Sequence, residues 1–87
     1  MGSYRIEWTR SGSKELGRLP KDAIARVLSA VETLADNPHR PGTRKLTNSE
    51  RTYRIRVGPY RVVYEVFESV LLVEVVRVGH RRKIYRG

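Results

Sequence analysis

The stretch that most constrains the fold runs from Tyr53 to Tyr64, with the sequence YRIRVGPYRVVY. Apolar and basic side chains alternate on both sides of Gly58-Pro59, and a period of two is typical of half-buried strands. The pattern predicts an antiparallel hairpin with these two residues as its loop, which places Arg56 directly opposite Arg61. Like charges facing each other across an antiparallel pair are destabilising. The hairpin is therefore either badly specified or built to hold an anion.

The alternation also assigns side chains to the two faces of this hairpin. The face expected to pack in the core carries Tyr53, Ile55, Val57, Tyr60, Val62, Tyr64 and Val66. The opposite face is expected to carry Arg54, Arg56, Arg61, Val63 and Glu65.

Positive charge is concentrated in the second half of the chain. The 87 residues carry a formal net charge of +9. Residues 1–38 contribute +1, whereas residues 39–87, with twelve basic and four acidic side chains, contribute +8. Such a surface favours a polyanionic partner, either nucleic acid or an acidic protein; the alternative is a basic surface with no partner. Fourteen of the 18 basic residues are arginine, which suits bidentate contact with phosphate or carboxylate.

The composition excludes several classes of protein. Hydrophobic residues make up 39% and charged residues 31%, which suits one small folded domain over residues 1–87. The absence of cysteine excludes a disulfide scaffold and a thiolate metal site. Apolar runs are too short for a transmembrane helix, and no secretory signal is visible, so we expect a cytoplasmic protein.

The residues before the hairpin predict one strand and two helices. Tyr4–Thr9 alternates like a half-buried strand, and a serine of Ser11-Gly12-Ser13 can cap a short helix over Lys14–Leu19. Apolar residues recur at helical spacing over Lys21–Asp36 and form one continuous stripe. Asn37-Pro38 is expected to end this second helix.

The residues around and after the hairpin complete the predicted topology. Thr43–Leu46 is expected to be a short extended piece within a loop. After a turn at Glu68-Ser69, the almost continuously apolar run Val70–Val78 predicts a strand buried on both faces at the centre of the sheet. The order is one strand, two helices and a three-stranded antiparallel meander. It predicts an α+β fold in which helices pack on one face of a four-stranded sheet.

The side chains available for chemistry are few. The sequence contains no Gly-rich phosphate loop, no metal-spaced cluster of histidines and carboxylates and no Ser/His/Asp set, so we expect neither a metal nor a cofactor. What remains is a cluster of arginines with Tyr60, Tyr64, Tyr85 and His80 nearby. Such a set can bind an RNA backbone and stack bases. It can also stabilise the transition state of phosphodiester cleavage without a metal.

Four segments, in this order and spacing, resemble the RelE/ParE toxin superfamily of type II toxin–antitoxin systems, in particular its RelE-like branch. They are Leu16–Pro20, Asn37–Leu46 (NPHRPGTRKL), Tyr53–Tyr64 and Val76–Tyr85 (VRVGHRRKIY). In the RelE branch the resemblance implies a ribosome-dependent endoribonuclease, an mRNA interferase that inhibits translation. In the ParE branch it implies a non-catalytic toxin that binds DNA gyrase.

The resemblance implies roles for five residues. Arg54 and Arg56 match the bases on the hairpin of RelE proteins, and Arg61 matches the arginine that stabilises the transition state. Arg81 matches the residue assigned as the acid for the leaving group, and Tyr85 matches the tyrosine that stacks on the substrate. In the implied reaction the 2′-hydroxyl of the messenger attacks the adjacent phosphate, which leaves a 2′,3′-cyclic phosphate and a 5′-hydroxyl.

Proton transfer is assigned less directly than charge. Arginine has a pKa above ~12 and is a poor general base, so we expect Arg54 and Arg56 to act by electrostatic positioning. Histidine is the residue type most often used as an acid or base near neutral pH, so His80 is the reserve candidate for that role. The residues expected to bind RNA in addition are Arg44, Lys45, Arg82 and Lys83.

The resemblance also implies partners. We expect a cognate antitoxin protein, the ribosome and messenger RNA, no membrane, and a toxin that is monomeric within the toxin–antitoxin complex. Two alternatives stay open at this point: a ParE-like toxin that binds gyrase, and an inactive relative that binds only RNA or an antitoxin.

Overall fold

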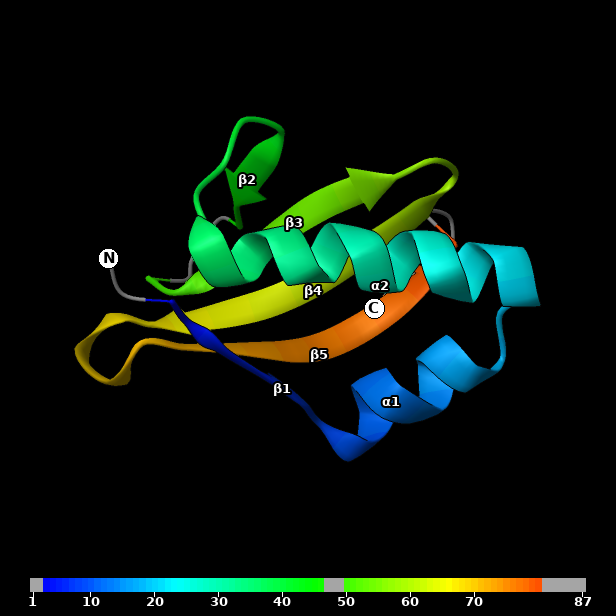
Figure 1. The fold of residues 1–87 in the computed structure, drawn as a ribbon, viewed down its shortest axis with the longest axis horizontal. Helices are drawn as coiled ribbons and strands as arrows, with labels where there is room; N and C mark the ends of the chain where they lie inside the picture. Colours follow the sequence, from blue (N-terminus) through cyan, green and yellow to red (C-terminus); the bar gives the residue numbers. More distant parts are fainter. Residues whose placement is uncertain (1–2, 47–49, 81–87) are drawn as a thin grey trace.

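The fold is a five-stranded sheet with two helices, an α+β architecture (Figure 1). The computed structural model describes residues 3–46 and 50–80. The elements in chain order are β1 (Arg5–Trp8), α1 (Arg10–Gly17), α2 (Lys21–Asp36), β2 (Thr43–Lys45), β3 (Thr52–Val57), β4 (Tyr60–Phe67), a 3-10 turn (Glu68–Val70) and β5 (Leu72–His80). Neither described helix is long and apolar enough to cross a membrane.

The sheet has the strand order β1-β5-β4-β3-β2. The three-stranded meander of β3, β4 and β5 is confirmed, and β1 joins it by parallel pairing with β5. The sheet has one strand more than predicted, because Thr43–Lys45 pairs with β3 instead of forming part of a loop. Three residues are too few to show a period of two, so this strand is visible only through its pairing.

The first helix differs from the prediction at its start. The predicted helix over Lys14–Leu19 begins at Arg10, and the side chain of Thr9 caps it by accepting a hydrogen bond of 3.0 Å from the Gly12 amide. Gly12 therefore lies inside the helix and is not a break before it. The second helix has the predicted bounds, Lys21–Asp36.

The hydrophobic core lies between α2 and the sheet, and Figure 1 shows α2 lying across one face of the strands. It contains Val27, Val31, Leu34, Ile55, Val57, Val62, Tyr64, Val66, Val73, Val75 and Val78. Burying one such aliphatic side chain contributes roughly 1.5–3 kcal/mol. The predicted apolar face of the hairpin is confirmed, although Tyr53 and Tyr60 at its ends are only half-buried.

The long apolar run Val70–Val78 is explained by an irregular register. Its predicted central place is confirmed, since β5 lies between β1 and β4. The prediction that this run is buried on both faces is wrong. Val70 and Leu71 precede the strand and are exposed, and Val76 is half-buried. The pairing with β4 shifts by one residue at Val76, so the buried side chains change from Val73 and Val75 to Val78. A bulge of this kind inserts one extra residue into a strand.

Candidate anion-binding site

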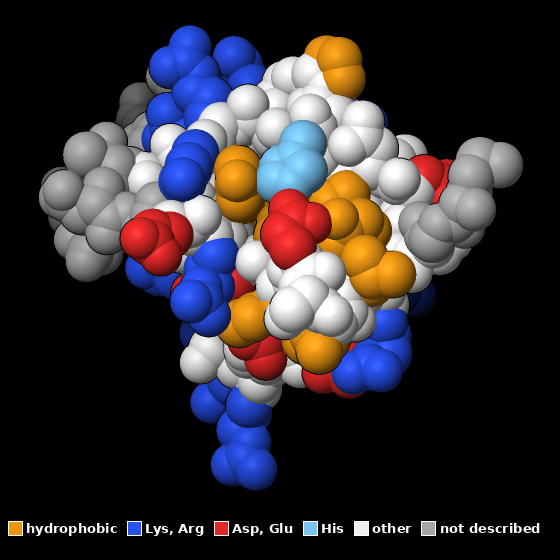
Figure 2. All heavy atoms as spheres, turned by 90° about the vertical axis from the view of Figure 1, so that its left-hand side faces the viewer, with side chains coloured by type: hydrophobic (Ala, Val, Ile, Leu, Met, Phe, Trp, Pro, Cys, Tyr) orange, Lys and Arg blue, Asp and Glu red, His pale blue; other side chains and the backbone are white. Residues whose placement is uncertain are grey.

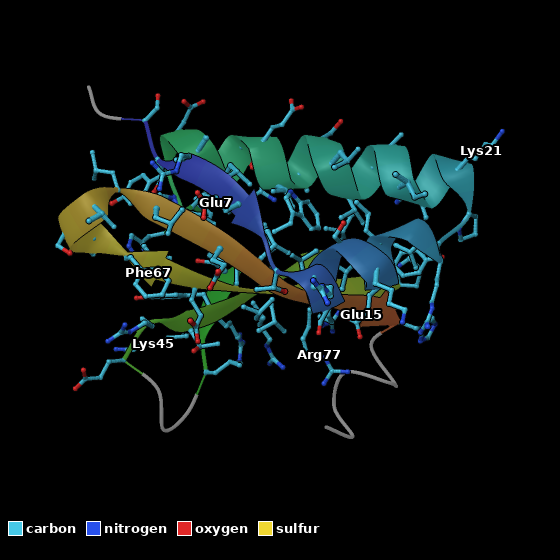
Figure 3. All side chains as sticks on the ribbon, turned by 90° about the horizontal axis from the view of Figure 1, so that it is seen from below. Glu7, Glu15, Lys21, Lys45, Phe67 and Arg77 are labelled. Carbon is cyan, nitrogen blue, oxygen red and sulfur yellow. The ribbon has the colours of Figure 1, made fainter. Side chains whose placement is uncertain are left out.

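Four arginines surround a cavity on the face of the sheet turned away from α2. The cavity has a volume of about 230 Å³ and is lined by Gly42, Arg44, Arg54, Arg56 and Arg61. Arginine alternates here with core residues along β3, so the same pleat that buries one face directs guanidinium groups to the other. Figure 3 shows this outer side of the sheet below the strands, with Lys45 and Arg77 labelled. We call this the arginine cavity.

Strand register brings the arginines together. Arg56 lies directly opposite Arg61, as predicted, and Arg44 of the edge strand lies directly opposite Arg54. Among the residues that the structure describes, the lining of the cavity holds four arginines and no acidic side chain. Facing like charges are costly in the free protein, and an anion placed between them offsets that cost through charge-assisted hydrogen bonds.

Two glycines shape the backbone around the cavity. Gly58 turns the hairpin with a φ of 58°, and a Cβ there would lie 2.9 Å from a guanidinium nitrogen of Arg26 on α2. Gly42 has a φ of 97° just before β2 begins. Both values lie in the left-handed region that glycine adopts without steric cost. Arg56, which is exposed, makes a long contact of 3.5 Å from its Nε to the Gly58 carbonyl.

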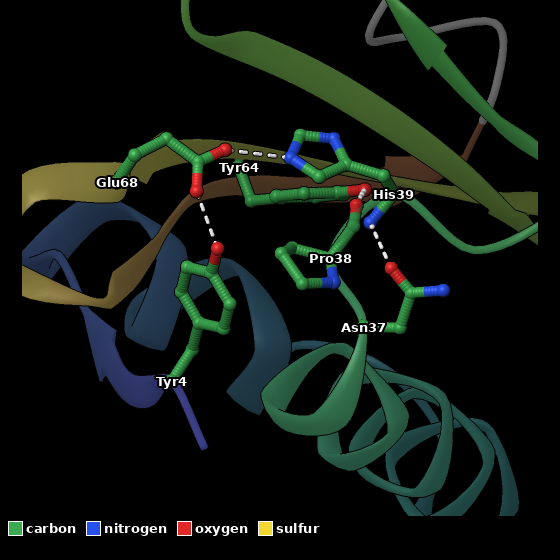
Figure 4. A network of polar contacts seen from close by, with 6 residues as sticks. All are labelled: Tyr4, Asn37, Pro38, His39, Tyr64 and Glu68. Carbon is green, nitrogen blue, oxygen red and sulfur yellow. Dashed lines mark hydrogen bonds and ion pairs between the residues drawn. The ribbon is translucent and has the colours of Figure 1, made fainter. Parts of the chain in front are cut away.

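The segment that leads into β2 is anchored from beneath. The Tyr64 hydroxyl donates a hydrogen bond of 2.7 Å to the Pro38 carbonyl, and burial raises the pKa of Tyr64 to about 12. His39 Nε2 lies 2.7 Å from a carboxylate oxygen of Glu68, whose other oxygen accepts a hydrogen bond from Tyr4 (Figure 4). The bonds from Tyr4 and then His39 lower the pKa of Glu68. These contacts fix the chain that carries Gly42 to the arginine cavity.

Tyr64 does not lie with the arginines of the cavity. Tyr64, expected near them in sequence, is fully buried on the core side of the sheet, which excludes it from contact with a base. Its ring stacks on Tyr53 with centroids 6.0 Å apart, and His39 meets Tyr53 edge-on at 4.9 Å. The sequence carried no sign of this cluster, because His39 and Glu68 are 29 positions apart.

The other predicted site residues lie outside the arginine cavity. His80 is exposed at the end of β5, where its ring meets Tyr60 edge-on at 6.2 Å. Lys45 is exposed, but it lies opposite Tyr53 of the core face and does not line the arginine cavity. Figure 2 shows basic side chains gathered at the top of this view. Four predicted residues, Arg81, Arg82, Lys83 and Tyr85, lie outside the described residues. Within residues 3–46 and 50–80, no three histidines or carboxylates lie close enough to hold a metal ion.

Known proteins share both the sequence pattern and the fold. A family model described as the ParE toxin of type II toxin–antitoxin systems matches residues 6–85. The chain is 34% identical over 84 residues to Toxin RelE of Mycobacterium tuberculosis, which covers 95% of this chain and 87% of the relative.

Two solved structures show how far the similarity extends in space. The RelBE2 toxin–antitoxin complex of Mycobacterium tuberculosis has a chain that is 28% identical, with a TM-score of 0.81 over 91% of this chain and 99% of that chain. The archaeal RelE–RelB complex of Pyrococcus horikoshii OT3 is also 28% identical, with a TM-score of 0.79 over 91% of this chain and 96% of that chain.

Proposed function

We propose that this chain cleaves messenger RNA on the ribosome. The chain belongs to the RelE/ParE toxin superfamily of type II toxin–antitoxin systems and to its RelE-like branch. The observation that carries this proposal is the arginine cavity, in which three adjacent strands direct four guanidinium groups to one point. In this proposal a single toxin domain acts in the cytoplasm as an endoribonuclease.

The proposed chemistry uses the charge of the cavity. The 2′-hydroxyl of the RNA attacks the adjacent phosphate, so negative charge increases on the phosphoryl oxygens in the transition state. Guanidinium groups bind such oxygens in a bidentate manner, and fixed donors stabilise charge that develops during a reaction. Arg61 and Arg56 face each other across the hairpin, which suits them to grip one phosphate from two sides.

Proton transfer is proposed from the family resemblance alone. Arginine side chains stay protonated in proteins and are poor bases, so we assign Arg54 and Arg56 to phosphate positioning. Arg81 is proposed to protonate the leaving 5′-oxygen, and Tyr85 to stack on the substrate. His80 does not line the arginine cavity, and its reserve role as acid or base requires the substrate to reach the end of β5.

The proposed protein partner is a cognate antitoxin. Related RelE proteins have been solved as complexes with RelB. We propose that one toxin molecule of this chain is covered by an antitoxin, with complementary charge supporting the encounter, because residues 39–87 carry a net charge of +8.

The test is cleavage by the purified protein in a translating ribosome system. Messenger RNA ends should appear with 2′,3′-cyclic phosphates, and naked RNA should remain almost intact. Arg61→Ala should lower the cleavage rate about 10²–10³-fold through lost transition-state stabilisation. Arg5→Ala, which removes an exposed arginine on β1, is the matched control and should cut at the wild-type rate.

A second candidate function is favoured by the family model, whose description names the ParE toxin. In that case the chain would bind DNA gyrase without catalysis. Plasmid supercoiling by gyrase in the presence of the protein separates the two functions. Intact messenger RNA together with inhibited supercoiling would overturn the proposed endoribonuclease.

A further inference from the structure

A second hollow lies between α1 and the end of β5. Its volume is about 190 Å³, and its lining includes Glu15, Arg18, Tyr60, Arg77, Gly79 and His80. It exists because β1 pairs with β5 only as far as Trp8 opposite Val75, whereas β5 continues to His80. Helix α1 takes the place of the missing strand. We call this the α1–β5 hollow.

Glu15 fixes the polar wall of the hollow. One carboxylate oxygen accepts a hydrogen bond of 2.8 Å from the Val78 amide. Val78 lies past the last residue of β5 that pairs with β1, which is Val75. The other oxygen lies 3.6 Å from the guanidinium of Arg77, and Figure 3 shows the two labelled side chains close together. A carboxylate has about four lone-pair sites, so these two contacts leave Glu15 able to accept further hydrogen bonds.

The lining suits a nucleobase better than a phosphate. Glu15 places a carboxylate in this lining, and a carboxylate repels a nearby phosphate. None of the described residues that line the arginine cavity is acidic. A base edge presents both donors and acceptors, which a carboxylate and the guanidinium groups of Arg18 and Arg77 can match. Half-buried Tyr60 and exposed His80 add two rings at an interplanar angle of 80°, and rings of these residue types stack bases in RNA-binding proteins.

The hollow and the arginine cavity lie next to each other across the pairing of β4 with β5. Arg61 of the arginine cavity pairs directly with Gly79 of the hollow, and the neighbouring rung pairs Tyr60 with His80. Facing residues of an antiparallel pair have Cα atoms about 4.5–5.5 Å apart. Gly79 carries no side chain that could separate the two sites. A nucleotide can therefore place its phosphate at Arg61 and its base beyond Gly79.

We propose that the α1–β5 hollow binds the nucleobase of a nucleotide whose phosphate is held in the arginine cavity. This inference rests on the proposed function, since it requires the arginine cavity to hold an RNA phosphate. The hollow then selects RNA by its bases, a task that the arginines cannot perform because they contact the same phosphate in every sequence.

The experiment measures binding of short RNA to the purified full-length chain by fluorescence anisotropy. The probes are a labelled trinucleotide with 2′-O-methyl groups, which cannot undergo 2′-hydroxyl attack, and three copies of it with one base removed at each position in turn. Wild-type protein should bind one abasic probe about 5- to 100-fold more weakly, the range expected for one stacked base.

Variants of the hollow identify where that base binds. Glu15→Gln and Arg77→Gln should each reduce the abasic penalty to less than about threefold. Both should melt close to wild type, because the amide oxygen introduced by Glu15→Gln can still accept from the Val78 amide, and in Arg77→Gln Glu15 itself still does. Arg5→Gln removes one positive charge, as Arg77→Gln does, from an exposed arginine on β1 and should leave the abasic penalty unchanged. In an NMR titration, the Val78 and Gly79 amide signals should shift with the complete trinucleotide and not with the abasic probe.

The outcomes separate this inference from the proposed function. Arg61→Ala should weaken all four probes equally while the abasic penalty persists. If Arg61→Ala has no effect on any probe, the phosphate site fails, and the proposed function fails with it. If Arg61→Ala weakens binding but the abasic penalty is absent, or survives in both Glu15→Gln and Arg77→Gln, the nucleobase site is overturned alone.

Discussion

Gly12 lies where the backbone of α1 comes close to the backbone of β5. A Cβ at this position would lie 2.6 Å from the Val75 carbonyl oxygen and 3.3 Å from the Thr9 hydroxyl oxygen. Backbone atoms must move to relieve such a contact, so we expect Gly12→Ala to lower the free energy of unfolding by ~1–3 kcal/mol. Urea unfolding of the purified protein measures the difference.

Gly17 provides the matched control for that substitution. It belongs to the same helix, and a Cβ there would meet nothing within 4 Å. Gly17→Ala should be neutral or stabilise by ~0.5–1 kcal/mol, the usual gain from removing a helical glycine. An equal loss of stability in both variants would show that alanine destabilises α1 for a reason unrelated to its contact with β5.

Gly12 also explains why the predicted start of α1 was wrong. Ser11-Gly12-Ser13 reads as a break, because glycine and serine punctuate helices. Glycine is equally required where two backbones nearly touch, and only the packing of α1 against β5 separates these two causes. The error of four residues in the predicted helix start follows from this ambiguity.

Tyr64 predicts an alkaline transition. Burial raises the pKa of the Tyr64 hydroxyl to about 12, whereas the ordinary pKa of a tyrosine is about 10. A raised pKa in the folded state means that the stabilisation is complete below pH 10 and is lost as the pH rises from 10 to 12. Over that interval wild-type protein should lose ~2–3 kcal/mol more stability than Tyr64→Phe. Denaturant unfolding at pH 9 and pH 12 measures this; parallel losses in both proteins would contradict it.

At the scale of elements, the segment between α2 and β2 is held by side chains from distant parts of the chain. Glu68, in the turn before β5, contacts His39 of this segment and Tyr4 at the start of the chain. We expect Glu68→Ala to lower stability at pH 6 by under ~1 kcal/mol, because the carboxylate is largely exposed to solvent.

The pH dependence of that loss is specific. The pKa of Glu68 is lowered in the folded state, so its contribution is present above the unfolded pKa and is lost as the pH falls through the folded value. The stability difference between wild type and Glu68→Ala should therefore shrink from pH 6 towards pH 2. Glu7→Ala removes another exposed carboxylate, paired with Arg5, and is the control for a general charge effect. A constant difference across this pH range would count against the contacts seen here.

Elements with a strong period were predictable, and elements defined by pairing were not. The helical spacing of sixteen residues was enough to predict both ends of α2, and the alternation on both sides of Gly58-Pro59 was enough to predict the hairpin register. β2 has only three residues, and it is a strand only because β3 offers its edge. The bulge in β5 left a continuous apolar run that is typical of a strand buried on both faces, so the wrong burial was assigned.

At the scale of the whole molecule, the candidate site depends on strand order. The alternation along the hairpin was enough to place Arg54, Arg56 and Arg61 on one face. Arg44 joined them only because β2 lies next to β3, which no local pattern indicates. The α1–β5 hollow depends on where β1 stops beside β5, a property of three elements far apart in sequence. Local chemistry was therefore predictable, and the neighbouring surfaces required the fold.

The distribution of charge over the molecule predicts how RNA binding depends on salt. The affinity of single-stranded RNA falls with salt, with a log–log slope of about −0.7 for each phosphate contacted. If the arginine cavity makes the contacts, the double variant Arg44→Gln/Arg54→Gln should lower the magnitude of that slope by about 0.7 for each phosphate lost. Anisotropy titrations of a 2′-O-methyl oligonucleotide from low to moderate salt measure it.

The control removes equal charge from the half of the chain that carries a net charge of only +1. Arg5 and Arg10 are both exposed and lie in β1 and α1, so Arg5→Gln/Arg10→Gln lowers the net charge by the same two units without touching the arginine cavity. We expect its salt slope to match that of wild type, because the number of phosphates contacted is unchanged. If both double variants reduce the slope equally, binding follows the net charge of the protein, and the four convergent arginines have no special role in holding phosphate.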